Sequence, residues 1–217
     1  MEKRAALLIV DLQNDFCPGG ALPVADGDRV IAPINRAARF FAAARLPVLA
    51  SRDWHPPVTG HFREFGGAWP AHCVQGTPGA AFHPALRLPE GTVLLSKGMD
   101  PELDGYSAFE GVTADSRPLA GLLGELAVQR LFVCGLATDY CVLSTALEAL
   151  RRGFEVTLLT NAVAGVDAVP GASAGAIEEM KKAGALLATV AELQSGSGGA
   201  IGRSAPTGSL PASRNTA

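Results

Sequence analysis

The sequence predicts a single α/β domain built around a parallel sheet, and two patterns support this prediction. Short apolar runs recur along the chain, and they are continuous rather than alternating, as expected for strands buried on both faces. Segments with helical spacing of apolar residues separate most of these runs. Alternating strands and helices imply right-handed crossovers, with helices on both faces of the sheet. We therefore predict one Rossmann-like domain of about six strands over residues 1–194.

The apolar runs mark the expected strands. They cover residues 5–10, 47–51, 92–96, 131–134, 155–159 and 186–190. Their lengths are typical of strands rather than of helices.

Helices are expected between these runs. They cover residues 30–45, 116–128, 139–152 and 172–183. In the first of them, apolar residues such as Ile31 and Ile34 recur at spacings of three and four. We expect Ser116 to cap the second helix, Thr138 to cap the third, and Gly153 to end the third.

Two stretches interrupt this rhythm. Residues 53–90 are rich in His, Pro, Gly and Trp and show no clean periodicity. An irregular connection of this length in a compact domain is usually functional. Residues 195–217 are rich in Gly, Ser, Ala and Pro, so we expect a flexible tail without catalytic chemistry.

The composition narrows the class of partner. Of the 217 residues, 48% are hydrophobic and 18% are charged, which excludes disorder of the whole chain. Eighteen Lys and Arg residues against 21 Asp and Glu residues give a net charge of −3, which offers no basic surface for nucleic acid. We therefore expect a small-molecule ligand. Four cysteines are too few for a disulfide scaffold.

The N-terminal apolar run ends at Asp11 and is too short for a membrane span or a secretory signal. We accordingly expect a cytoplasmic protein with no membrane partner. The sequence leaves open whether the chain forms a homo-oligomer.

Chemically useful side chains follow four of the predicted strands. Asp11 follows the first strand, Asp53 and His55 follow the second, and Lys97 follows the third. Cys141 follows the fourth strand, in the first turn of the next helix. Ligands bind outside the carboxyl ends of the strands in an open parallel sheet, so we predict that these groups converge on one edge.

Cys141 is the candidate nucleophile. At a helix start, the dipole and the unpaired backbone N–H groups favour a thiolate and can hold an oxyanion during acyl transfer. Lys97 would favour the thiolate further, and Asp11 would pair with Lys97 or carry a proton to a leaving amine. The structural alternatives are a packed thiol, a strand-end lysine with its ammonium in water, and a loop cap. The other three cysteines are assigned no chemistry.

A second group combines imidazoles with a carboxylate. Asp53 and His55 point to the same side of an extended strand end, and His61 and His72 follow in the irregular segment. Two or three imidazoles with a carboxylate suit Zn, Fe or Mn. The alternative is that the loop histidines are exposed to solvent or cap turns. We interpret the fourth histidine, His83, as a surface residue.

Six short motifs that contain these residues occur in order along the chain. They are VDLQNDF from Val10, DWHP from Asp53, WPAHC from Trp69, SKG from Ser96, YSAF from Tyr106 and GLATDYCV from Gly135. Together they resemble the nicotinamidase branch of the isochorismatase-like cysteine hydrolases. The resemblance runs from Lys3 to Leu193 and therefore covers all but the C-terminal segment.

The resemblance implies an amidohydrolase that converts nicotinamide to nicotinate and ammonia in NAD salvage, with pyrazinamide as an alternative substrate. The family's catalytic triad would fall on Asp11, Lys97 and Cys141. Its metal ligands would fall on Asp53, His55 and His72, with His61 as a further ligand in some members. The resemblance implies one divalent metal ion, zinc first, with iron or manganese as alternatives.

The resemblance also implies how the substrate is held. Aromatic walls around the pyridine ring would fall on Phe16 and Trp69, and Tyr106 would line the same pocket. The oxyanion hole would consist of the backbone N–H groups of Ala137 and Cys141. In the family a cis peptide bond precedes the first of these residues, which here would be the Leu136–Ala137 bond.

Other functions are compatible with parts of this pattern. A related cysteine amidase would act on another small carboxamide or a ureido substrate. An isochorismatase is disfavoured because Cys141 is present, and a metal-free amidase is disfavoured by the carboxylate and histidine set. A catalytically silent metal-binding protein is disfavoured because three catalytic residue types stand at three separate strand ends. Ammonia release from nicotinamide separates the enzyme from the silent protein.

Overall fold

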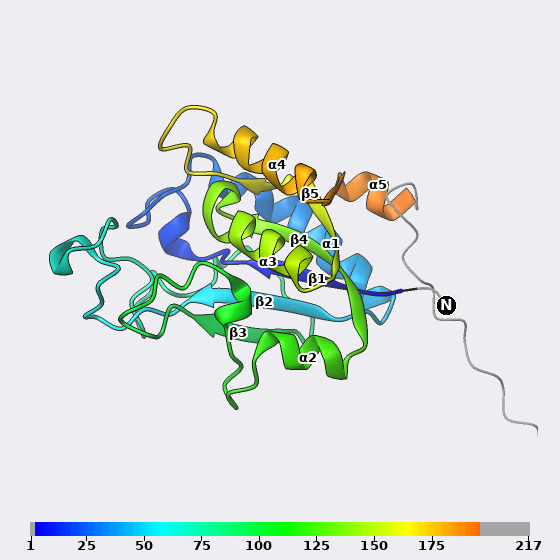
Figure 1. Ribbon diagram of the computed structural model, residues 1–217, viewed down its shortest axis with the longest axis horizontal. Helices are drawn as coiled ribbons and strands as arrows, with labels where there is room; N and C mark the ends of the chain where they lie inside the picture. Colours follow the sequence, from blue (N-terminus) through cyan, green and yellow to red (C-terminus); the bar gives the residue numbers. More distant parts are fainter. Residues whose placement is uncertain (1–2, 196–217) are drawn as a thin grey trace, which may run out of the picture.

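The computed structural model describes residues 3–195 and contains one six-stranded parallel sheet in the order β3-β2-β1-β4-β5-β6 (Figure 1). The predicted fold class is therefore confirmed. The predicted tail lies, beyond Ser195, outside the described residues. No helix among residues 3–195 is long and apolar enough to cross a membrane.

Each strand lies at a predicted apolar run, but β4 and β5 extend beyond the predicted bounds. The strands are β1 (Arg4–Val10), β2 (Val48–Asp53), β3 (Val93–Lys97), β4 (Val128–Leu136), β5 (Glu155–Ala164) and β6 (Leu186–Ala188). β4 is longer than predicted because polar residues also belong to it: Arg130 lies at its start and forms an ion pair with Glu155 at the start of β5. A search for apolar runs cannot detect such strand ends.

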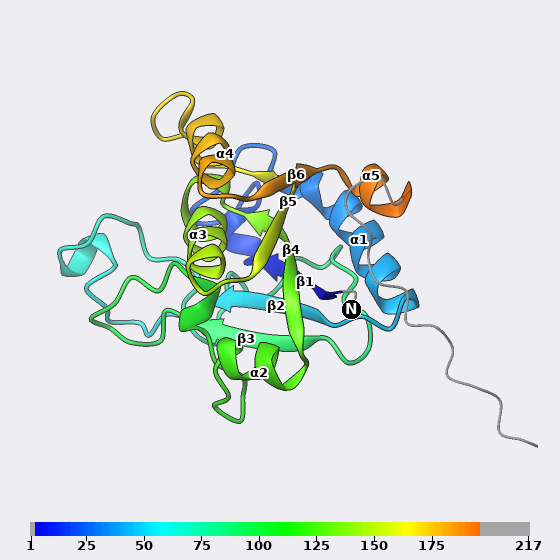
Figure 2. The ribbon, with the colours of Figure 1, turned by 45° about the vertical axis from the view of Figure 1, so that its right-hand side comes forward.

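Within residues 3–195, five α-helices cover the sheet. They are α1 (Ile31–Ala43), α2 (Leu119–Glu125), α3 (Leu143–Arg151), α4 (Ala172–Lys182) and α5 (Val190–Ser195). Figure 2 shows α1 and α5 on one side of the sheet and α2, α3 and α4 on the other.

Successive side chains along each strand point to opposite faces of the sheet, so there are two apolar cores, one on each face. In β1, Leu7 and Ile9 face α1 and α5, whereas Leu8 and Val10 face the other three helices. All four side chains are fully buried. Burial of each stabilises the fold by about 1.5–3 kcal/mol, which explains why the central strands read as continuous apolar runs.

Two predicted helix caps are wrong. Ser116 has a φ of 63° and lies in a turn, and α2 begins only at Leu119, after Pro118. The side chain of Thr138 makes no cap hydrogen bond; the chain enters a π-helical turn, Thr138–Val142, directly after Ala137. The predicted helix end at Gly153 is confirmed, since this glycine adopts a φ of 86° just beyond α3.

Helix α5 was not predicted, although the sequence contains a signal for it. Thr189 and Glu192 form a reciprocal capping box, in which each side chain accepts a hydrogen bond from the backbone N–H of the other. This capping box ends the predicted strand 186–190 early and starts the helix.

The segment between β2 and β3 is irregular, as predicted. It contains one 3₁₀ turn, Arg63–Phe65, and isolated strand-like pairings such as His55 with Val74. Figure 1 shows the segment projecting beyond the carboxyl ends of the strands. It therefore lies where ligands bind in a parallel sheet.

Candidate functional site

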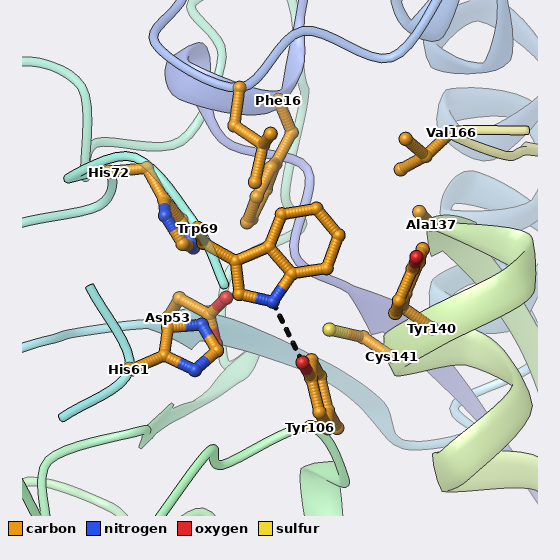
Figure 3. Close-up of a pocket in the computed structure, with 11 residues that line it drawn as sticks. Phe16, Asp53, His61, Trp69, His72, Tyr106, Ala137, Tyr140, Cys141 and Val166 are labelled. Atoms are coloured by element: carbon orange, nitrogen blue, oxygen red, sulfur yellow. Dashed lines mark hydrogen bonds between the residues drawn. The ribbon is translucent and has the colours of Figure 1, made fainter. Parts of the chain in front are cut away.

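The predicted site residues meet at the carboxyl edge of the sheet, around one pocket (Figure 3). The pocket is lined by Phe16, Leu22, Asp53, His61, Trp69, His72, Tyr106, Ala137, Tyr140, Cys141 and Val166. In Figure 3, Asp53, His61 and His72 lie on one side of it, and Ala137, Tyr140 and Cys141 lie on the other. Asp11, Lys97 and His55 do not line the pocket but lie close to residues that do, namely Asp53 and Cys141.

Lys97 is the polar centre of the site. It is the last residue of β3 and is fully buried. Its Nζ lies 2.8 Å from Asp11 Oδ2, 2.5 Å from Asp53 Oδ1 and 3.4 Å from Cys141 Sγ. A strand-end lysine with its ammonium in water is thus excluded. The ammonium is held by charge, and two buried carboxylates keep its pKa well above the usual range although burial opposes this.

Asp11 follows β1 with a φ of 46°, a conformation that aspartate tolerates better than most residues. Ser51 Oγ donates a 2.7 Å hydrogen bond to its Oδ1. Complete burial raises the pKa of Asp11 to about 6; the Lys97 ammonium opposes the rise and the Asp53 carboxylate adds to it. Such a carboxyl group can exchange a proton near neutral pH.

Asp53 ends β2 and behaves differently from Asp11. Burial opposes its ionisation, yet the Lys97 ammonium and the His55 imidazole hold the pKa of Asp53 below its usual range. One oxygen faces Lys97, and the other lies 3.7 Å from His55 Nε2. The Asp53 carboxylate therefore joins the lysine to the histidine cluster.

Cys141 lies in the π-helical turn, with its sulfur close to both buried carboxylates. The direction of the Cys141 pKa is opposite to the one expected for a resting thiolate. Burial raises the pKa of the Cys141 thiol well above its usual range; the Lys97 ammonium lowers it, but Asp11 and Asp53 add to the rise. A neighbouring base is therefore needed to take the thiol proton as the sulfur attacks.

The turn before the thiol brings Ala137 to the wall of the pocket. The Leu136–Ala137 peptide bond is cis, as the resemblance implies. The carbonyl of Ala137 accepts hydrogen bonds from the backbone N–H groups of Tyr140 and Val142, which fixes the turn that carries Cys141.

Three histidines form a cluster of buried rings. One ring nitrogen from each of His55, His61 and His72 lies within 4.8 Å of those of the other two. The rings of His55 and His61 stack at a centroid distance of 4.7 Å. Solvent exposure of the loop histidines is thus excluded, because all three residues are buried.

The Nδ1 atom of every ring in the cluster already has an oxygen partner. His55 Nδ1 lies 3.0 Å from Gly98 O, and His72 Nδ1 lies 2.8 Å from Pro70 O. His61 Nδ1 lies 2.8 Å from Asp104 Oδ1. These contacts leave the Nε2 atoms to bind a ligand, and His55 Nε2 is buried without a hydrogen-bond partner.

This arrangement fits a metal ion. Metal-binding histidines commonly have an oxygen partner at the second ring nitrogen. Burial lowers the pKa of His72 to about 4 and also lowers that of His61, so both rings are neutral, as ligands must be. Three imidazoles with the free oxygen of Asp53 form a donor set suited to Zn, Fe or Mn.

Aromatic side chains form the walls of the pocket. Trp69 Nε1 donates a 2.8 Å hydrogen bond to the Tyr106 hydroxyl, drawn as the dashed line in Figure 3. Phe16 packs beside His72 at a centroid distance of 5.4 Å. All three aromatic residues predicted from the resemblance line the pocket.

Several pocket residues were missed by sequence reasoning. Tyr140 contacts the Trp69 ring edge-on at 4.9 Å. Tyr140 could have been predicted to line the pocket, because it lies directly before Cys141 in the predicted first helical turn. Leu22 and Val166 also line the pocket, but they lie in loops without a motif. Asp139 holds Val166 in place, because its Oδ1 accepts a 2.9 Å hydrogen bond from the Val166 N–H.

The remaining cysteines and histidine lie outside this chemistry. Cys17, Cys73 and Cys134 are free thiols buried in the core. His83 is half-buried and accepts a hydrogen bond from the Ala85 N–H. It is therefore not part of the histidine cluster.

Comparisons with known proteins agree with this arrangement of a candidate nucleophile, buried ion pairs and histidines. A family model described as the isochorismatase domain matches residues 5–192. The chain belongs to the isochorismatase family. Among curated members, it is 40% identical over 203 residues to the nicotinamidase of Escherichia coli (strain K12), covering 86% of this chain and 95% of that protein.

Other isochorismatase family members are similarly related. The chain is 40% identical over 184 residues to the nicotinamidase/pyrazinamidase of Mycobacterium tuberculosis, covering 82% of this chain and 95% of that protein. Among solved structures, the pyrazinamidase of Pyrococcus horikoshii in complex with zinc has a TM-score of 0.79 and 47% identity, covering 86% of this chain and 99% of that one. PnC1 from L. infantum in complex with nicotinate has a TM-score of 0.76 and 38% identity, covering 87% and 94%.

Proposed function

We propose that this protein is a nicotinamidase, which hydrolyses nicotinamide to nicotinate and ammonia and also accepts pyrazinamide. The observation that carries the proposal is a buried thiol, ammonium and carboxylate that meet a histidine cluster across one small aromatic pocket. The names of the similar proteins support the same substrate.

Cys141 is the proposed nucleophile, and Asp11 is its base. As Cys141 Sγ attacks the carboxamide carbon, its proton passes to Asp11, whose pKa of about 6 suits a proton carrier near neutral pH. The tetrahedral intermediate collapses as Asp11 gives this proton to the nitrogen, so that ammonia leaves and a thioester remains. Water then attacks the thioester with Asp11 as base, which releases nicotinate and restores the thiol.

Lys97 and the turn after β4 stabilise the charges of this reaction. The Lys97 ammonium lies 3.4 Å from the sulfur and stabilises the thiolate as it forms. We assign the backbone N–H groups of Ala137 and Cys141 to the oxyanion, because both residues line the pocket. Each oxyanion-hole donor is worth about 3–4 kcal/mol of transition-state stabilisation.

We assign the metal site to Asp53, His55, His61 and His72. A divalent ion bound there would supply a Lewis-acidic position for the ring nitrogen of the substrate. The chain's own residues orient the ring: Phe16, Trp69 and Tyr106 form an aromatic slot between the histidines and the thiol. We propose zinc as the ion, supported by the related structure solved with zinc, and we place the reaction in cytoplasmic NAD salvage.

The proposal is tested by ammonia release. The purified protein is assayed for metal content and then for ammonia from nicotinamide, pyrazinamide and a panel of small carboxamide and ureido compounds. We expect nicotinamide and pyrazinamide to be the best substrates. Preference for a ureido compound would overturn the substrate assignment, and metal binding without release of ammonia from any amide would overturn the enzyme assignment.

A further inference from the structure

One loop supports both halves of the proposed site. Residues 98–105 follow β3 and return to the site through two glycines with positive φ, 66° at Gly98 and 71° at Gly105. The two glycines touch: a Cβ added at Gly105 would lie 2.4 Å from the Cα of Gly98. The base of the loop is therefore closed: a larger residue at Gly105 would clash with the backbone of Gly98, and a Cβ at Gly98 would lie 2.5 Å from His55 Cε1.

The tip of the loop is tied to the segment that carries His61. The carbonyl of Pro101 accepts hydrogen bonds from Gly60 N at 2.9 Å and from Thr59 Oγ1 at 3.0 Å. Thr59 Oγ1 in turn accepts a 3.2 Å hydrogen bond from the backbone N–H of His61. These contacts fix the backbone of His61 but leave its ring free to turn.

Asp104 fixes the ring. Its Oδ1 lies 2.8 Å from His61 Nδ1, and it reaches inward from the surface: the Asp104 side chain is 61% exposed and that of His61 only 3%. The partners of His55 and His72 are backbone carbonyls, which cannot move away independently of the chain. Within the cluster of three, His61 is thus the ring whose partner is a side chain with a charge.

We propose that Asp104 is a positioning residue for the metal, which orients His61 and strengthens it as a ligand. The inference rests on the proposed metal site. By binding Nδ1–H, the carboxylate fixes the tautomer in which Nε2 carries the free electron pair, and it makes that nitrogen more basic. Loss of such a partner typically lowers metal affinity about 10- to 100-fold.

The test compares metal affinity in Asp104→Ala, Asp104→Asn and Glu102→Gln. Glu102 is a matched control in the same loop, because its removal changes the same charge and its side chain has no contact with the histidines. Zn²⁺ affinity is measured by competition with a chromogenic chelator, and the ligand geometry is followed by the absorption bands of bound Co²⁺. We expect affinity to fall about 10- to 100-fold in Asp104→Ala, less in Asp104→Asn, and less than about twofold in Glu102→Gln.

A double-mutant cycle separates positioning from general support of the fold. If Asp104 acts through His61, Asp104→Ala should cause no further loss of affinity in a His61→Ala background. Equal Zn²⁺ affinity and Co²⁺ spectra in Asp104→Ala and wild type would overturn this inference alone. An equal loss in both backgrounds would also overturn it. A wild-type protein that binds no divalent metal would instead overturn the metal site on which the inference rests.

Discussion

The two sides of the pocket are built by different means. On the nucleophile side, Asp11 and Lys97 stand at the ends of β1 and β3, and Cys141 lies in the turn after β4. On the metal side, His61 and His72 belong to the irregular segment between β2 and β3. The sheet itself fixes the first group, whereas contacts with loop carbonyls and with Asp104 fix the second.

Substitutions on the two sides of the pocket should therefore affect different properties of the protein. The nucleophile side is coupled to the core through buried charges, so its substitutions should affect chemistry and folding together. The metal side is coupled to loops, so its substitutions should affect metal binding while the sheet persists.

Cys141→Ala should lower kcat for nicotinamide by at least about 10³-fold, because the attacking atom is lost. Metal content should remain that of the wild type, since the sulfur is not among the proposed ligands. Ammonia release and elemental analysis measure the two effects. Cys134→Ala is the matched control: this thiol is buried within β4, and its loss should leave kcat within a few-fold of wild type.

Lys97→Met should lower the free energy of unfolding by about 3–5 kcal/mol, because two buried carboxylates lose their cation. Urea denaturation measures this effect. Lys3→Met is the control on the surface, where the Lys3–Glu155 pair is 49% and 40% exposed and should contribute no more than about 1 kcal/mol. Equal effects of the two substitutions would contradict a structural role for the buried charge cluster.

His72→Ala should weaken Zn²⁺ binding by more than about 100-fold, the upper range for loss of an outer partner, because a direct ligand is removed. Circular dichroism should still report the folded sheet. A chelator applied to the wild type should likewise remove activity and leave the fold. His83→Ala, with its half-buried ring outside the cluster, should bind zinc normally. If His72→Ala lowered the free energy of unfolding as much as Lys97→Met, the two sides of the pocket would not differ in their coupling to the fold.

The pH profile should reflect the nucleophile side. Asp11 must be ionised to accept the thiol proton, so kcat/KM should fall about tenfold per unit as the pH drops below about 6. For folding the sign is opposite: the pKa of Asp11 is raised from 3.8 to about 6, so its contribution to stability is fully present below 3.8 and is lost as the pH rises through 6. A flat rate profile between pH 5 and 7 would exclude Asp11 as the base.

Tyr106→Phe should have the smallest effect. It removes the acceptor of the Trp69 Nε1 hydrogen bond, which is worth about 0.5–1.5 kcal/mol, and should raise KM roughly 2- to 10-fold. We expect kcat to change less, because the substitution leaves the nucleophile Cys141 and its base Asp11 in place. A large loss of kcat with unchanged KM would assign Tyr106 to the chemistry instead of the pocket wall.

The same division explains how much could be predicted from the sequence. The rule that ligands bind at the carboxyl ends of parallel strands located Asp11, Asp53, Lys97 and Cys141 without any alignment. The raised pKa of the Cys141 thiol was not predictable, because it depends on burial, which a spacing pattern does not reveal.

Loop-to-loop contacts escaped prediction for a related reason. Asp104 lies 43 positions from His61, and Asp139 lies 27 positions from Val166. Contacts of this kind have no periodicity and no motif. Neither the helical nor the strand period applies to them. Capping at Thr189 was different, since its capping box was visible and simply unused.

Trapping the intermediate would show whether Cys141 forms a thioester with the substrate. Wild-type protein is mixed with excess nicotinamide, quenched in acid within one turnover and analysed by peptide mass spectrometry. We expect a nicotinoyl group on the peptide that contains Cys141, and none on that peptide in Cys141→Ala. Steady ammonia release by Cys141→Ala, or an acyl group on a different residue of the wild type, would contradict it.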